Sequence, residues 1–190
     1  MALSKALSGF RPSRIRGNGP NSTGQGEYTI ASGLAQNIFY GDLVTMNAGN
    51  IEVVTTIVDD KIFGVFAGCS YTEDAEPKWK RYWPTGTSAS DIVAYVYDDS
   101  RATFTVQADA SVTAGDVYAT TFTVTLGTGS TFTGNSGQGL KAAGRGDDGQ
   151  MTVLAAFKEA GNALGDAFPR VEVLLKQHVD NYVTVGVSAG

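Results

Sequence analysis

The 190-residue sequence contains one cysteine, one histidine and no long apolar run. The single cysteine, Cys69, excludes an intrachain disulfide and a cysteine-based zinc site. Because Cys69 lies in the apolar run IFGVFAGCSY, we expect it to be a small buried core residue. The sequence has neither the apolar segment of a signal peptide nor that of a membrane span, which predicts that the protein has no membrane partner.

Residues that could carry catalysis are also scarce. His178 is followed by Asp180, but a spacing of two only places both side chains on one face of a strand, and there is no G-x-S-x-G motif. The run GNSGQGLK at 134–141 lacks the Lys-Ser or Lys-Thr pair that follows the last glycine of a phosphate loop. The paired aspartates lack the alternating carboxylates of a calcium loop. We therefore predict a non-enzymatic protein without a metal or other cofactor.

Helix signals are few, because 24 glycines are scattered along the chain and apolar residues recur at a spacing of two. About a dozen short apolar runs separated by Gly, Asn and Asp turns predict an all-β fold, a short-stranded barrel or sandwich of the β-tulip or jelly-roll kind. The predicted strands cover residues 27–31, 42–46, 51–56, 61–71, 78–83, 91–97, 101–108, 116–120, 122–126, 151–157, 170–176 and 182–187.

Two segments carry more detailed expectations. In RATFTVQA (101–108), apolar and polar residues alternate, which predicts one buried face and one face in water. Residues 127–150 are rich in glycine and poor in apolar residues, so we expect a long surface loop there.

Charge is distributed unevenly. Residues 1–26 carry four Lys or Arg and no acid, which leaves 10 basic and 19 acidic residues in the rest of the chain, a net charge of −9. An acidic body repels phosphate backbones, so direct nucleic-acid binding is disfavoured. We divide the chain into an extended N-terminal arm, residues 1–26, and a β-rich domain, residues 27–190.

The arm is rich in glycine and proline and cannot offset its ordering entropy by burying its own residues, so we expect it to be extended or unordered in isolation. It does contain two apolar anchors, Phe10 and Ile15, and three arginines that can bind carboxylates with both nitrogens, Arg11, Arg14 and Arg16. This composition fits a tether that lies across a neighbouring subunit. A terminus without a partner is the alternative.

The segment KWKRYWP (78–84) interleaves aromatic and basic residues. Such a mixture can stack on sugars, hold carboxylates or anchor a protein interface. In one regular strand Trp79 and Trp83 would share a face and Tyr82 would point to the other. Core packing and a protein interface are the two interpretations of these aromatics.

The order of several segments resembles that of capsid decoration (cement) proteins of tailed bacteriophages. The segments are SGFRP (8–12), GEYTIASG (26–33), NIFYGDLVTM (37–46), FGVFAGCSY (63–71), RYWP (81–84), VYDDSRATFTVQAD (96–109), TGNSG (133–137) and RVEVLLKQHVDN (170–181). They span most of the chain, and the resemblance lies in their order rather than in any one of them.

The resemblance implies a structural virion protein, made in the host cytoplasm, that binds the outer capsid surface as a homo-oligomer, a trimer or dimer. It would stabilise joints between subunits of the major capsid protein. The residues that would bind the capsid are those of the arm, Phe10, Arg11, Pro12, Arg14, Ile15 and Arg16, with Trp79, Tyr82 and Trp83 as possible interface aromatics.

The alternative is a carbohydrate- or receptor-binding β-module of a phage particle. It would use the Trp/Tyr cluster and the glycine-rich loop as its site. It predicts an exposed aromatic platform, whereas the decoration hypothesis predicts buried aromatics.

Overall fold

The computed structural model describes residues 3–16, 24–55, 61–146 and 149–179. The predicted strand at 182–187 lies outside these ranges. The described residues form 14 strands and one short 3-10 helix, η1 (Ala114–Asp116), and every pair of neighbouring strands runs antiparallel. The all-β prediction is confirmed, and the sheets form a sandwich-like fold that does not close into a barrel.

The strands make three sheets. In spatial order, the first sheet contains β1 (Arg11–Ile15), β10 (Ala102–Gln107), β14 (Arg170–Leu175), β13 (Met151–Ala156), β11 (Thr121–Thr125) and β12 (Gly139–Gly146). The second sheet contains β2 (Gly26–Tyr28), β9 (Ser90–Tyr97), β6 (Gly64–Glu73), β4 (Leu43–Asn47) and β5 (Asn50–Val53), with β7 (Glu76–Lys80) also paired to β6. The small third sheet pairs β3 (Ile38–Phe39) with β8 (Tyr82–Trp83).

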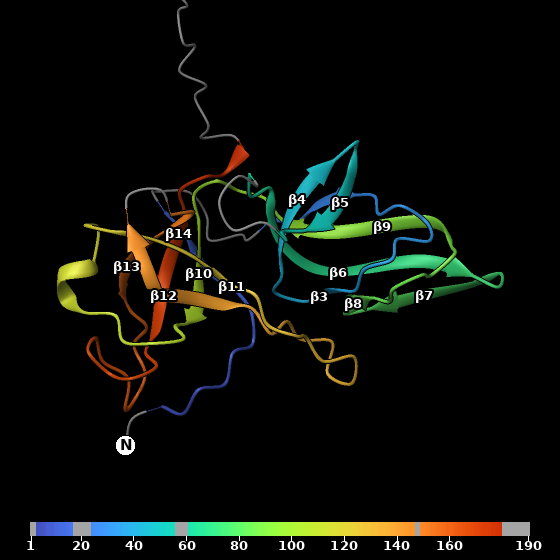
Figure 1. The fold of residues 1–190 in the computed structure, drawn as a ribbon. Coiled ribbons are helices and arrows are strands. Elements are labelled where there is room, and N and C mark those ends of the chain that lie inside the picture. The colour runs from blue at the N-terminus through green and yellow to red at the C-terminus, as the bar shows by residue number, and fades with distance from the viewer. Residues whose placement is uncertain (1–2, 17–23, 56–60, 147–148, 180–190) are drawn as a thin grey trace, which may run out of the picture.

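Two apolar clusters hold the sheets together. The larger one gathers the inner face of the first sheet around Phe104 and Phe122, and it takes in Leu43 and Val65 from the second sheet. The smaller one lies under the second sheet and includes Cys69, which is fully buried as expected. Figure 1 shows the first sheet on the left and the second and third sheets on the right. The shared residues of the larger cluster join these two halves.

The first strand departs from the order of the chain. All other strands of the first sheet come from residues 102–175, yet β1 pairs with β10 at its edge, with Arg11 opposite Thr105 and Ile15 opposite Ala102. Phe10, just before β1, is fully buried in the larger cluster. Residues 10–15 therefore belong to the folded body, unlike the separate arm that we expected for residues 1–26. The body supplies the burial that the segment's own composition lacks.

A close approach of two glycines lets Phe10 enter the core. The N–H of Phe10 donates to the carbonyl of Gly41 at 2.9 Å, and the N–H of Gly9 donates to the carbonyl of Gln138 at 3.0 Å. A Cβ on Gly9 would lie 2.7 Å from the Gly41 oxygen, and both glycines have positive φ, 79° and 90°. A side chain at either position would separate these backbones or strain them.

Three local expectations were wrong. Residues 116–120 do not form a strand, because the Asp116 carboxylate accepts the Thr113 N–H at 2.8 Å and fixes the helical turn η1. Residues 127–150 are not one loop, since they include β12. The polar face of β10 is not exposed to water, because all six residues of the strand are buried. The Gln107 amide group donates to the carbonyls of Ser4 and Phe168, so segments from the N-terminal and C-terminal parts of the chain cover that face.

Replacing Phe10 by alanine tests whether this residue is part of the core. We expect Phe10→Ala to lower the free energy of unfolding by about 3–5 kcal/mol, because a fully buried aromatic ring is lost. Urea unfolding followed by circular dichroism measures the change. Phe132→Ala is the matched control, since Phe132 is 97% exposed and its loss should change stability by less than about 0.5 kcal/mol. Equal midpoints for the two variants would contradict the core assignment.

Candidate partner-binding surface

Two arm residues, Arg14 and Arg16, differ in what their side chains contact. The Arg14 guanidinium binds both carboxylate oxygens of Glu172, at 2.7 and 2.9 Å, and the Thr103 hydroxyl donates to the same carboxylate at 2.6 Å. Burial of Glu172 opposes its ionisation, but the hydrogen bonds from Arg14 and Thr103 outweigh it and lower the pKa of the carboxyl. Arg16 is exposed, and its guanidinium carbon lies 6.0 Å from the centre of the Tyr118 ring, which is itself exposed. Arg16 is thus better placed than Arg14 to contact a partner.

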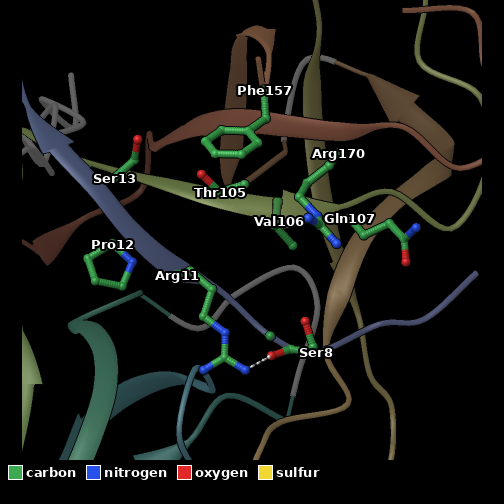
Figure 2. A pocket seen from close by; sticks show the side chains of 10 residues that line it. Ser8, Arg11, Pro12, Ser13, Thr105, Val106, Gln107, Phe157 and Arg170 are labelled. Carbon is green, nitrogen blue, oxygen red and sulfur yellow. Dashed lines mark hydrogen bonds between the residues drawn. The ribbon is translucent and has the colours of Figure 1, made fainter. Parts of the chain in front are cut away.

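An open pocket of about 490 Å³ lies beside β1 (Figure 2). Its lining combines Ser8, Gly9, Arg11, Pro12 and Ser13 with Thr105, Val106, Gln107, Phe157 and Arg170. Both cations of the lining already have partners. Arg11 donates to the Ser8 carbonyl at 2.7 Å, and Arg170 pairs with Glu159 at 2.8 Å. We therefore assign no ligand to this pocket.

The more distinctive arrangement is the Tyr40 cluster, which consists of Arg11, Tyr40, Lys80, Arg81 and Tyr82. The guanidinium carbons of Arg11 and Arg81 lie 4.5 and 4.3 Å from the centre of the Tyr40 ring. The Lys80 ammonium lies 5.9 Å from the Tyr82 ring. Such cation–π contacts hold cations in place without neutralising them.

The cluster lacks negative charge. None of Arg11, Lys80 and Arg81 forms an ion pair with a carboxylate of the described residues, although the chain as a whole has a net charge of −5. Burial lowers the pKa of the Arg11 guanidinium, and the nearby Arg81 acts in the same direction. A carboxylate brought to this surface by another molecule would be favoured electrostatically.

A loop packed against the cluster presents an exposed aromatic side chain. This Phe132 loop, residues 126–138, follows β11 and projects below β3, β7 and β8 in Figure 1. Its tip is closed by hydrogen bonds from Ser130 N–H to the Asn135 carbonyl, 2.9 Å, and from Gly134 N–H to the Ser130 carbonyl, 2.7 Å. Phe132 at this tip is 97% exposed.

Backbone contacts fix the Phe132 loop to the Tyr40 cluster. Tyr40 N–H donates to the Gly134 carbonyl at 2.9 Å, and Ser136 N–H donates to the Tyr40 carbonyl at 3.0 Å. The Arg11 guanidinium donates to Asn135 Oδ1 at 3.1 Å, and Gly134 packs so closely on Arg81 that a Cβ there would lie 2.9 Å from the Arg81 Cβ. The base of the Phe132 loop is therefore anchored on the Tyr40 cluster, whose three cations have no carboxylate partner in the described part of the chain.

Asp42 lies beneath this loop and is 4% exposed. Its carboxylate accepts the Phe39 N–H at 2.7 Å and a hydrogen bond from Ser136. Burial nevertheless raises the pKa of Asp42 to about 6. Ionising this buried carboxyl group therefore costs free energy, although its hydrogen bonds to Phe39 and Ser136 hold the base of the loop in place.

The three predicted interface aromatics are separated by the structure. Trp83 is fully buried, and Tyr82 is half-buried and stacked on Phe39 with ring centres 5.5 Å apart. Trp79 is 63% exposed. The common face predicted for Trp79 and Trp83 is wrong, because the regular strand ends at Lys80 and a new strand begins at Tyr82. The buried Trp83 is what the decoration hypothesis predicted, and the exposed Trp79 is what the carbohydrate-binding alternative predicted.

Four residues of this surface, Tyr40, Lys80, Arg81 and Phe132, were not among the predicted site residues. Lys80 and Arg81 do lie in the segment KWKRYWP, whose mixture of aromatic and basic residues the sequence shows. Phe132 had a usable signal, since it is a lone aromatic residue within a polar glycine-rich loop, where packing alone would not require it. Tyr40 had none, because its position between two arginines depends on contacts between distant segments. The capsid-binding roles predicted for the arm residues stay predictions.

Comparisons with protein-family models, with curated proteins and with solved structures found no match for this chain. Across the described ranges, no group of three or more His, Cys, Asp and Glu side chains is placed to share a metal ion. Within the same part of the chain, no helix has the length and hydropathy needed to cross a membrane.

Asp42→Asn should change how stability depends on pH. The folded-state pKa of Asp42 is raised from 3.8 to about 6, so the folded protein binds this proton more tightly than the unfolded chain does. The wild-type protein therefore loses stability from this group as the pH rises from about 4 to 6, on the order of 3 kcal/mol, and the variant lacks that loss.

Urea unfolding at pH 4, 5, 6 and 7 would measure this effect. The stability of Asp42→Asn relative to wild type should rise across the interval and then level off. Asp91→Asn, at an exposed position, controls for the loss of one negative charge. Parallel pH profiles for wild type and Asp42→Asn would show that Asp42 does not titrate in this way.

Proposed function

We propose that this protein is a structural virion protein that binds the outer surface of a phage capsid. It would stabilise joints between subunits of the major capsid protein. The observation that carries the proposal is the combination of the Tyr40 cluster with the Phe132 loop. Together with the segment order that resembles decoration proteins, this surface supports a role in protein binding.

The chemistry of the surface identifies the partner face that would fit it. Phe132 is an apolar anchor on a loop closed by its own hydrogen bonds, so little conformational entropy is lost when it docks. Arg11, Lys80 and Arg81 belong to the cluster on which this loop is anchored, and they have no acidic partners among the described residues. The expected partner face is therefore acidic around a small apolar pocket. Protein interfaces are enriched in aromatic and arginine side chains.

The arm contributes to this proposal in a revised form. Phe10 is fully buried within its own chain, so it would support the capsid contact by fixing β1 rather than by touching the capsid. Exposed Arg16 remains available for a carboxylate of the capsid. Two separate contact regions on each copy, repeated in a dimer or trimer, would make binding multivalent and raise the cost of opening the shell.

The second candidate function is carbohydrate or receptor binding by a module of a phage particle. The observation that favours it is the exposure of Trp79, which is 63%. A capsid contact through the Phe132 loop leaves Trp79 unused, so the two functions are compatible in one chain.

Binding to phage heads that lack this protein tests the capsid proposal. We expect Phe132→Ala to weaken binding by about 30-fold, as for a typical interface anchor, and Arg81→Glu to weaken it further because it places an acid against an acidic face. Co-sedimentation of purified protein with heads over a concentration series measures the affinity.

The matched control in the head assay is Trp79→Ala, which removes an exposed aromatic outside the proposed contact. It should saturate the heads like the wild type. The proposal loses its basis if Phe132→Ala and Arg81→Glu bind heads as tightly as the wild type does, or if the wild type does not bind them.

A further inference from the structure

Trp79 is supported by the backbone of the neighbouring strand. It lies on β7 opposite Ser70 of β6, and its indole leans over Gly68. A Cβ on Gly68 would lie 3.2 Å from Cζ2 of the indole and 3.7 Å from Cε2, and Gly68 has a φ of 134°. The ring thus fills the space that a side chain at position 68 would need, while 63% of Trp79 stays exposed. It is an open aromatic surface with a fixed support.

Polar groups continue from Trp79 across the outer face of the second sheet. Cys69 and Tyr71 point into the core, so Ser70 between them points outward. Tyr95 on β9 lies opposite Gly68, and its hydroxyl is 3.3 Å from that of Ser70. Glu27 on β2 lies opposite Tyr95 in the register and is exposed.

This row, Trp79, Ser70, Tyr95 and Glu27, is the Trp79 row. Lys78, the residue before Trp79, does not add an unpaired positive charge to the row, because its ammonium pairs with Glu73 at 2.7 Å. Lys80 is directed toward Tyr82 of the Tyr40 cluster. The row therefore offers one aromatic surface, two hydroxyls that can donate or accept, and one carboxylate acceptor.

We propose that the Trp79 row binds a neutral oligosaccharide. A pyranose has an apolar C–H face, which fits against an indole, and a rim of hydroxyls, which fits the donors and acceptors of Ser70, Tyr95 and Glu27. A protein partner would need a wider apolar surface at the centre of its contact than one aromatic ring among polar groups. This inference gives the second candidate function its site and ligand class, and it does not depend on capsid binding.

The chain is suited to a fluorescence test, because it contains only two tryptophans. Trp83 is fully buried and Trp79 is exposed, so iodide quenching of the native protein reports on Trp79. Maltohexaose, cellohexaose and chitohexaose serve as probes of α-linked, β-linked and N-acetylated chains, each up to about 20 mM, since a single small platform binds weakly. We expect a saturable blue shift and protection from iodide with at least one of them.

Variants locate the binding. By titration calorimetry with the responding sugar, Trp79→Ala should weaken binding at least about 10-fold and Tyr95→Phe about five-fold, as expected for loss of the stacking surface and of one hydrogen bond. Trp79→Phe, which keeps an aromatic ring, should fall between Trp79→Ala and wild type. Circular dichroism and urea midpoints confirm that each variant is folded.

Phe132→Ala separates the two proposals. It should bind the sugar like the wild type while losing affinity for heads, and Trp79→Ala should do the reverse. The carbohydrate proposal is overturned if none of the three sugars gives a saturable change, or if Trp79→Ala keeps wild-type affinity for the sugar that binds. Neither result would bear on head binding, which is measured in a separate assay.

Discussion

The close approach of Gly9 to Gly41 is the contact on which the arrangement of this protein depends. It allows the backbone of the N-terminal segment to hydrogen bond to the turn before β4 and to Gln138 at the same time. Phe10 then enters the core, and β1 continues along β10 into the first sheet. The same passage brings Arg11 next to Tyr40. This backbone contact thus fixes the N-terminal segment to the turn before β4 and places the first cation of the Tyr40 cluster.

The fold class followed from the sequence because it depends on local periodicity, and most predicted strands correspond to observed ones. The exceptions have local or distant causes. β1 contains proline and two arginines and has no strand pattern of its own; it is a strand because β10 offers a free edge and the core accepts Phe10. β12 is rich in glycine, and pairing with β11 decides its conformation. The 116–120 segment has strand-forming residues, but Asp116 and Thr113 close a turn there.

The candidate surface was less accessible to prediction, for a physical reason. Its cations come from residue 11 and residues 80–81, and its aromatic rings come from residues 40, 82 and 132, so the topology alone brings them together. Sequence reasoning found the unusual charge of the N-terminal segment and the aromatics at 79–83. It treated the first as a separate arm and the second as one strand, because both judgements required knowledge of where each strand ends.

The position of β1 also has a consequence for biosynthesis. The ribosome makes β1 before the other described strands, but Arg11 pairs with Thr105, and β10 in turn pairs with β14 at residues 170–175. Phe10 therefore has no complete binding site until most of the chain has been translated, and contacts of such high sequence separation form slowly. The second sheet, built from residues 26–97, can pair its strands while the N-terminal segment is still waiting. Until β10 and β14 are available, the apolar side chain of Phe10 therefore stays exposed to other molecules in the cell.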